Sequence, residues 1–167
     1  MLNNKEIRNL IEEKDLISNY IDLDTQLQPN GFDLTIADVY ELLSAGQIDF
    51  DNSQRRFPLI KSLFPDNKYG VQLVQGCYQI LFNEVIKIPL NLIGISINRS
   101  SLMRCGCSTA VGIWDAGYEG KGKTSLLVSN LQGLSLYKNA RIVQILFLEL
   151  NDVENGYAGV FQGEGIR

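Results

Sequence analysis

The sequence predicts a protein of the all-β class, built mainly of strands, that folds as an antiparallel barrel or a double-sheet sandwich. From Tyr69 onward, short runs of β-branched, aliphatic and aromatic residues follow one another at close spacing, and turn signals such as Gly117 and 130–133 separate them. Many short strands divided by turns are typical of β-barrels and β-sandwiches. The length of 167 residues favours a single domain that spans residues 1–167.

Residues 1–27 are predicted to form a short helix and an extended lead-in to the β domain. Apolar residues recur at helical spacing within residues 3–14, and Asn3 or Asn4 can cap this helix. Apolar and polar residues then alternate up to Leu27, which indicates an extended segment.

The β region begins after a strong turn signal at residues 28–31. In the strand predicted at 32–36, Asp33 points away from its apolar neighbours, so we expect it on a polar, solvated face. Residues 44–70 show little periodicity and are predicted to be a long connection that holds at most one short strand. Further strands are predicted at 76–82, 84–88, 92–97, 109–114, 124–129, 134–136 and 140–149.

Composition excludes several classes of partner and location. The chain has 15 Lys and Arg against 19 Asp and Glu, a net charge of −4, so we expect no nucleic acid as its main partner. No apolar run approaches the roughly 18 residues needed to cross a bilayer, and the N-terminus lacks the apolar core of a signal peptide. No membrane partner and a cytoplasmic location are therefore expected.

The residue types that the sequence lacks exclude several kinds of catalytic site. The chain contains no histidine, which excludes Ser-His-Asp and Cys-His catalysis and removes the commonest transition-metal ligand. Cys105 and Cys107 form a lone C-x-C without a second pair, which does not indicate a zinc site. A catalytic site must therefore be built from carboxylates, arginines, amides and hydroxyls.

Two neighbouring stretches carry such residues. Arg99-Ser-Ser-Leu-Met-Arg104 places two guanidinium groups and two hydroxyls within one predicted helical turn, a combination that suits phosphate oxygens. Gly112-Ile-Trp-Asp-Ala-Gly-Tyr-Glu-Gly120 ends an apolar run on the carboxylate of Asp115. A carboxylate near bound phosphate can orient or deprotonate a water molecule, so these stretches predict phosphate-ester or anhydride chemistry.

Two later features complete the list of candidates. Arg141 and Gln144 lie in an otherwise apolar strand and point to opposite faces unless a bulge intervenes. The tail at 154–167 carries four glycines and two aromatic residues, and it is either a frayed end or a mobile flap that orders on a ligand.

Five motifs, in chain order, resemble those of the dUTPase and dCTP deaminase superfamily, and most closely those of the archaeal-type dUTPases. The resemblance runs from about residue 28 to the C-terminus. Each motif alone is weak, but five in the family's order are a specific signal. The motifs are Gly31-Phe-Asp-Leu34, Arg99-Ser-Ser-Leu102, Gly112 to Gly120, Gly133 with Asn139-Ala-Arg-Ile-Val-Gln144, and Gly156-Tyr-Ala-Gly-Val-Phe-Gln162.

This resemblance implies a distorted jelly-roll or β-barrel with a short N-terminal helix and one helical turn. It implies a homotrimer with active sites at the subunit interfaces, and a dUTP diphosphatase that hydrolyses dUTP to dUMP and pyrophosphate with Mg²⁺. The metal would be bound through substrate phosphates and water rather than directly by the protein. The tail would close over the site.

The resemblance also implies a role for each matching residue. Asp115 would activate the attacking water, and Tyr118 would pack on the deoxyribose and exclude a 2′-hydroxyl. The phosphates would be held by Arg99, Ser100, Ser101 and Gln144. The uracil edge would be read by Thr109, Ala110 and Val111, largely through the backbone. The candidate tail contacts are Tyr157, Phe161 and Arg167.

Two alternatives share the same motifs. Deaminases of this superfamily, including those that both deaminate dCTP and hydrolyse dUTP, carry a glutamate on the strand after the third motif. Here the matching position on strand 124–130 is Ser125 or Leu127, and neither side chain is a general acid or base at neutral pH. The other alternative is a non-catalytic nucleotide-binding protein, against which the retained Asp115 argues.

Overall fold

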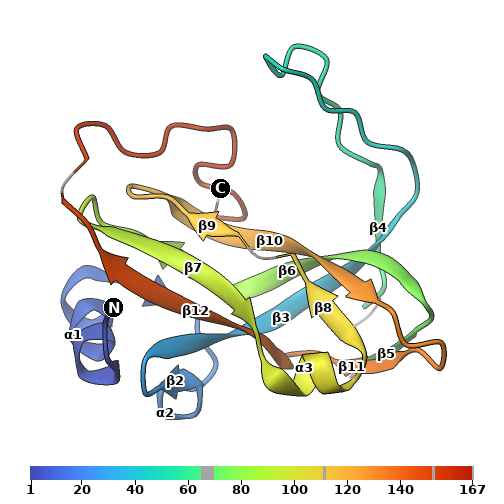
Figure 1. Cartoon of the computed structure of the whole chain (residues 1–167), viewed down its shortest axis with the longest axis horizontal. Helices are drawn as coiled ribbons and strands as arrows, with labels where there is room; N and C mark the ends of the chain where they lie inside the picture. The colour runs from blue at the N-terminus through green and yellow to red at the C-terminus, as the bar shows by residue number, and fades with distance from the viewer. Residues whose placement is uncertain (65–69, 111, 152, 167) are drawn as a thin grey trace.

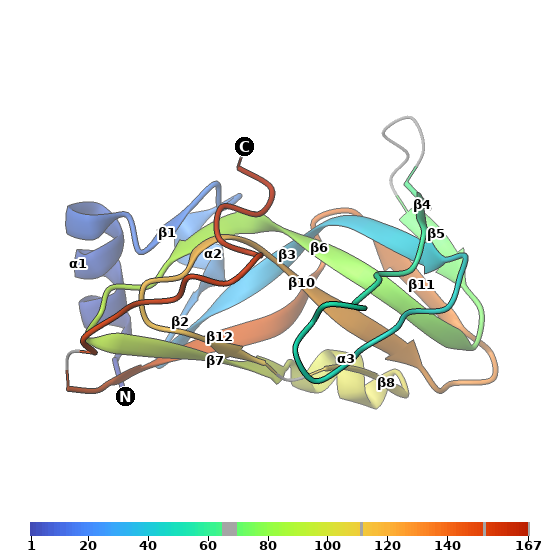
Figure 2. The same cartoon turned by 90° about the horizontal axis from the view of Figure 1, so that it is seen from above.

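The computed structural model describes residues 1–64, 70–110, 112–151 and 153–166. It confirms the predicted mainly β fold: a ten-stranded sheet curls into an open half-barrel, with a short helix at one end and a separate two-stranded sheet at the other (Figures 1 and 2). The main path of the large sheet runs β8 (Cys107–Thr109), β10 (Glu119–Val128), β6 (Gly76–Lys87), β3 (Gly31–Leu42), β12 (Arg141–Glu149), β7 (Leu92–Asn98) and β9 (Ile113–Trp114).

Short strands extend this path at its sides. β1 (Ile17–Ser18) pairs with β6, whereas β2 (Leu27–Gln28) and β4 (Ile60–Ser62) pair with β3. β4 is the single short strand expected in the long connection. The two-stranded sheet consists of β5 (Gly70–Leu73) and β11 (Leu134–Tyr137). All these pairs are antiparallel.

The N-terminal helix α1 (Asn4–Lys14) begins where the sequence predicts it. The Asn3 side chain accepts hydrogen bonds from two backbone N–H groups of the first turn, and the Glu6 carboxylate accepts one from the Asn3 N–H, which completes a capping box. Ile7 and Ile11 are the buried residues of the helix and join the main core. Within the described ranges, no helix is long and apolar enough to cross a membrane.

The prediction of an extended lead-in is wrong at residues 23–26, where the chain forms the short helix α2 (Leu23–Gln26). The Asp22 side chain caps this helix by accepting from the Thr25 N–H at 2.7 Å. The Gln26 amide lies in the core, where it donates to the Asp33 carbonyl and to Glu84, both at 2.8 Å. These hydrogen bonds to residues far away in the sequence, rather than a local periodic pattern, hold the α2 helix in place.

The hydrophobic core fills the inside of the curled sheet. Alternate residues of β6 are buried, as expected for a strand with one face against a core. Each large apolar side chain of this kind stabilises the folded state by about 1.5–3 kcal/mol relative to exposure. The bulkiest fully buried side chains are Phe32, Phe82, Phe147, Ile7, Leu16, Ile17, Leu34, Ile36, Leu73, Ile80, Ile86 and Leu92.

Three strands differ in extent from their predictions. The runs 76–82 and 84–88 form the single strand β6, because the Asn83 amide between them is hydrogen-bonded to Thr35 and Asn139 across the sheet. The run 109–114 is not one strand, since β8 ends at Thr109 and β9 begins at Ile113. β10 begins earlier than predicted, at Glu119, and a register shift at 121–123 bends it.

One acidic side chain, Glu84, is fully buried beneath the sheet. Its carboxylate accepts hydrogen bonds from the Thr35 N–H at 2.9 Å, from the Thr35 hydroxyl and from the Gln26 amide at 2.8 Å. Burial raises the pKa of Glu84, and the hydrogen bonds from Thr35 and Gln26 oppose this rise.

The raised pKa of Glu84 predicts a pH-dependent stability. As pH rises past 4.5, the ordinary value for a glutamate, the unfolded state releases this proton before the folded state does. The Glu84 contribution to the free energy of unfolding therefore falls until pH exceeds the folded-state pKa. In urea unfolding from pH 4 to 8, wild type should lose stability relative to Glu84→Gln. Glu13→Gln, on the exposed side of α1, serves as the control; a constant difference between wild type and Glu84→Gln would contradict the prediction.

Candidate active site

A pocket of about 620 Å³ opens between β9 and β10, which lie toward opposite ends of the strand order of the curled sheet. One wall is the turn between β9 and β10, residues 115–118, which we call the β9–β10 turn, and a second wall is β10 from Gly122 to Ser125. The tail contributes Tyr157 and Phe161. Further lining residues are Phe57, Pro58, Ile60, Gln79, Phe82, Ser96, Ala110, Gly112, Ile113, Trp114, Val143 and Glu164.

The β9–β10 turn fixes Asp115 at the pocket. The Asp115 carbonyl accepts from the Tyr118 N–H at 3.1 Å and closes the turn, while Gly117 and Tyr118 exchange backbone hydrogen bonds with Ile88. Gly117 has a φ of 82° and lies against the backbone of Gly156, a conformation and an approach that suit glycine. The Asp115 side chain is exposed at this turn, so its carboxylate is open to solvent and to a ligand.

Three aromatic rings that pack edge-to-face form the floor beside Asp115. The ring centroids of Trp114 and Tyr118 are 5.6 Å apart and those of Tyr118 and Tyr157 are 5.5 Å apart, both edge-to-face. The Trp114 indole N–H donates to the Ser96 hydroxyl. Gly122 passes directly under the Trp114 ring, where a Cβ would come within 2.0 Å of it. Burial raises the pKa of Tyr118, as do Glu164 and Tyr157, so its phenol is neutral at physiological pH.

The tail lies against the β9–β10 turn and the start of β10, rather than fraying away from them. The Tyr157 N–H donates to the Ala116 carbonyl and the Gly163 N–H to the Glu119 carbonyl, both at 2.8 Å. The Gln162 side chain accepts from the Glu119 N–H and donates to the Gly117 carbonyl. Together these bonds bring the predicted tail residues Tyr157 and Phe161 to the pocket.

An ion pair reinforces this attachment. Lys123 of β10 and Glu164 of the tail are 2.8 Å apart and both line the pocket. Arg167, the third predicted tail residue, lies outside the described residues.

Of the residues predicted to read the base, Ala110 lines the pocket, whereas Thr109 does not. Thr109 is buried, and its N–H and hydroxyl both donate to the Asn98 amide oxygen at 2.7 and 2.6 Å. Ala110 lines the pocket; its N–H donates to the Ser125 carbonyl at 3.0 Å, and its carbonyl accepts from the Thr124 hydroxyl at 2.9 Å. Val111 lies outside the described residues.

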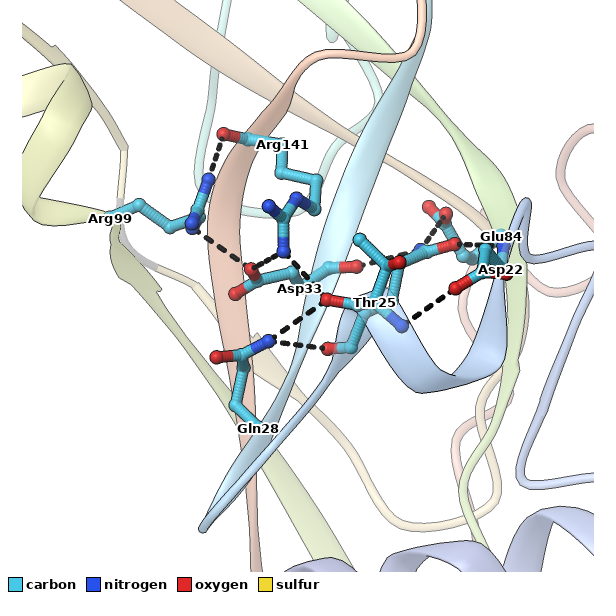
Figure 3. A network of polar contacts seen from close by, with 8 residues as sticks. Asp22, Thr25, Gln28, Asp33, Glu84, Arg99 and Arg141 are labelled. Carbon is cyan, nitrogen blue, oxygen red and sulfur yellow. Dashed lines mark hydrogen bonds and ion pairs between the residues drawn. The ribbon is translucent and has the colours of Figure 1, made fainter.

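A second polar cluster joins three of the sequence motifs and is centred on Asp33 (Figure 3). Arg99 Nε and Arg141 Nη1 lie 3.0 and 3.1 Å from the same Asp33 carboxylate oxygen. Arg99 also donates to the Arg141 carbonyl at 2.9 Å, and Arg141 donates to the Thr25 carbonyl at 2.6 Å. We call Asp33, Arg99 and Arg141 the arginine cluster.

The expectation that Asp33 lies on a solvated face is wrong, because its side chain is 1% exposed beneath the two arginines. A register shift in β12 between Arg141 and Val143 allows Arg141 to reach it, which is the bulge the sequence left open. Burial raises the pKa of Asp33, whereas the positive charges of Arg99 and Arg141 oppose this rise.

The predicted phosphate-binding residues gather near the arginine cluster rather than in the pocket. Ser100 and Ser101 are exposed at the start of α3 (Ser100–Arg104), directly after Arg99. Gln144 is the cross-strand partner of Asp33, so the two side chains share a face of the sheet. Among the residues that the structure describes, these four predicted side chains do not line the pocket.

Several pocket residues were missed from the sequence. Lys123 and Glu164 are 41 positions apart, and no local pattern signals that they pair. Phe57 lies in the connection of low periodicity. Gln162, which does not line the pocket but bonds the tail to Gly117 and Glu119, appeared only as the last residue of a motif. Turn glycines marked where the tail bends, but nothing in the sequence indicated which strand it contacts.

Comparison with known proteins agrees with the motif order. A family model described as dCTP deaminase-like matches residues 1–150. A probable deoxyuridine 5′-triphosphate nucleotidohydrolase of Methanosarcina acetivorans is 43% identical over 169 residues, which cover 100% of this chain and 99% of the relative. The protein of the same name in Archaeoglobus fulgidus is 43% identical over 166 residues, covering 99% and 98%.

A solved structure shows the same fold. The dCTP deaminase of Agrobacterium tumefaciens superposes with a TM-score of 0.69 at 22% sequence identity, over 87% of this chain and 47% of that one. The chain therefore spans about half of that structure, and the likeness concerns the fold alone. Because the family model and the relatives cover nearly the whole sequence, the chain belongs to the dCTP deaminase-like family, as the ordered motifs predicted.

Proposed function

We propose that this enzyme is a dUTP diphosphatase, which hydrolyses dUTP to dUMP and pyrophosphate. The observation that carries the proposal is the composition of the pocket: Asp115 is an exposed carboxylate at the β9–β10 turn, while β10 presents the neutral side chains of Thr124 and Ser125 to the pocket. Such a site can activate water, but the part of β10 that lines it, residues 122–125, offers no acid to protonate a cytosine ring. The names of the archaeal relatives support the same reaction.

In this proposal Asp115 is the general base. Its carboxylate takes a proton from a water molecule as the water oxygen bonds to phosphorus and the bond between the α-phosphate and the leaving pyrophosphate breaks. The oxygen of water stays on the phosphorus that it attacks, and its proton passes to Asp115. The exposure of Asp115 supports this role, because the base must reach solvent water.

The aromatic floor would select a deoxyribose. Tyr118 is held between Trp114 and Tyr157, so its ring offers a fixed apolar surface. A 2′-hydroxyl placed against that surface would lose water without gaining a hydrogen bond. The Ala110 carbonyl accepts one bond from Thr124 and has a second lone pair, which suits the N3–H of uracil.

The phosphates would be bound by Arg99, Ser100, Ser101 and Gln144. The residues present fit a magnesium ion that is held through phosphates and water: within the described ranges, no three His, Cys, Asp or Glu residues gather to hold a metal directly. When bound, Mg²⁺ neutralises charge on the phosphates. Asp115 would then orient the water, and Arg99 the phosphate oxygens.

A homotrimer with sites at subunit interfaces follows from the family resemblance, and the placement of the two groups supports it. In one chain the pocket and the phosphate-binding residues do not share a lining. Contact between copies would bring the arginine cluster of one to the pocket of another. Analytical ultracentrifugation should give three times the mass of the 18.7 kDa chain. A cytoplasmic location, without a nucleic-acid or membrane partner, remains a prediction.

The deaminase alternative has one observation in its favour, a second carboxylate at the pocket. Glu164 lies on the tail, and its carboxylate is already engaged by an ion pair of 2.8 Å with Lys123. A substrate panel of dUTP, dCTP, dTTP and UTP with Mg²⁺ separates the candidates. We expect pyrophosphate from dUTP and at least about tenfold less from UTP, because of the extra hydroxyl. Ammonia from dCTP would show a deaminase, and binding without any product a non-catalytic protein.

A further inference from the structure

The connection between β3 and β4 forms a defined arm, residues 43–59, which rises away from the sheet (Figure 1). Gln47 and Arg56 exchange two backbone hydrogen bonds of 2.9 Å across it. At its base the Leu43 N–H donates to the Leu59 carbonyl at 2.8 Å, and the Leu59 N–H to the Ser44 hydroxyl at 2.9 Å. The arm is therefore a hydrogen-bonded hairpin whose two legs are held in register.

The tip of the arm is also ordered by side chains. Asp49 accepts from the Gln54 N–H at 2.9 Å, and the Asn52 side chain accepts from the Arg55 guanidinium at 3.1 Å. This turn places the Arg55 guanidinium carbon 5.4 Å from the centre of the Phe57 ring, within cation–π range. Phe57 thus has a fixed neighbour on its own arm.

The returning leg of the arm reaches the pocket and meets the tail there. Phe57 and Phe161 both line the pocket, and their ring centroids are 5.7 Å apart with an interplanar angle of 51°. Although the rings touch, 60% of Phe57 and 36% of Phe161 remain exposed. Two large aromatic rings that face a pocket and keep apolar surface in water are suited to stack on a planar ligand.

The tail is anchored by hydrogen bonds on either side of Phe161, at Tyr157 and Gln162. Tyr157 and Gln162 are bonded to the β9–β10 turn and to Glu119 directly after it, and the chain between these two anchors turns, with the Gln162 N–H donating to the Gly159 carbonyl at 3.1 Å. In the described part of the chain, the ring that contacts Phe161 is Phe57.

We propose that Phe57 is a positioning residue, which docks the Phe161 ring over the pocket so that arm and tail together hold the nucleobase. We call this pair the aromatic clasp. The base would lie on the pocket side of Phe161, because insertion between the rings needs a separation of about 7 Å, twice the contact distance of two carbon surfaces. The nature of the ligand rests on the proposed function, whereas the docking of the tail by the arm does not.

The test compares Phe57→Ala with Phe50→Ala. Phe50 is the matched control, since it carries the same side chain on the same arm but is fully exposed and does not line the pocket. We expect Phe57→Ala to speed hydrogen exchange of the backbone amides at 157–164 in the unliganded protein. It should raise KM for dUTP by about two- to tenfold, the usual value of one aromatic pair, and change kcat by less than twofold. Phe50→Ala should change neither quantity.

Further variants test whether the aromatic ring of Phe57 is required or only the volume of its side chain. Phe57→Tyr should restore slow exchange and a low KM, whereas Phe57→Leu, which keeps an apolar side chain without a ring, should not. The double variant Phe57→Ala with Phe161→Ala should bind dUTP no more weakly than Phe161→Ala alone, because the two rings act as a unit.

Two results would overturn the proposal. Tail exchange in Phe57→Ala equal to that in Phe50→Ala would show that the arm does not dock the tail. Faster exchange with an unchanged KM would show that the clasp does not hold the base. The exchange measurement needs no turnover, so it decides the docking of the tail even if the chain does not hydrolyse dUTP.

Discussion

Asp115→Asn is expected to lower kcat for dUTP hydrolysis by about 10²- to 10⁴-fold, the usual contribution of a general base. An amide has nearly the shape of the carboxylate but cannot take the proton of the attacking water. The turn should persist, because it is closed by the Asp115 backbone carbonyl rather than by its side chain. Pyrophosphate release measures the loss, and calorimetric titration with dUTP should show that binding remains.

Glu164→Gln is the control for this variant, since among the described residues Glu164 is the other acidic residue that lines the pocket. Its carboxylate is paired with Lys123, so its replacement should loosen the tail and raise KM far more than it lowers kcat. The thermal midpoint of Asp115→Asn should match that of wild type. Full activity in Asp115→Asn would show that Asp115 is not the general base and that another group activates the water.

Those parts of the fold that have a local signature could be predicted from the sequence. The α1 helix has a capping box and a helical repeat, and strands such as β12 are continuous apolar runs. The α2 turn has no such pattern, because Gln26 is held by partners that are 7 and 58 residues away. Likewise, Asn83 looked like a break in β6, although its amide donates to Thr35 of β3 and to Asn139 in the turn before β12.

The candidate site likewise contains some residues that the sequence could predict and others that it could not. Asp115 and Tyr118 were found because glycines and aromatic residues mark their turn, and the motif order identified the family. The burial of Asp33 could not be inferred, since alternation along β3 says which face a side chain takes but not what covers that face. The contact of Phe57 with Phe161 joins residues 104 positions apart, and only the folded sheet brings them together.

Asp33→Asn is expected to lower the free energy of unfolding by about 2–4 kcal/mol. Removing one partner of a fully buried ion pair costs about 3–5 kcal/mol, and the loss here is smaller because the side chains of Arg99 and Arg141 are 28% and 31% exposed and can reach water. Urea denaturation measures it directly. The variant should also raise KM for dUTP, since Arg99 would lose the carboxylate that orients it.

Asp24→Asn provides the matched comparison, because Asp24 forms an ion pair of 2.7 Å with Arg8 but is 84% exposed. Solvent and salt screen such a pair, so the loss in this variant should be slight and should vanish at high ionic strength. The loss in Asp33→Asn should persist in salt, because its carboxylate is shielded from ions by the protein. Equal losses in the two variants would mean that the arginine cluster is not a structural anchor, and Arg99 would then have to be held for phosphate binding by contacts other than Asp33.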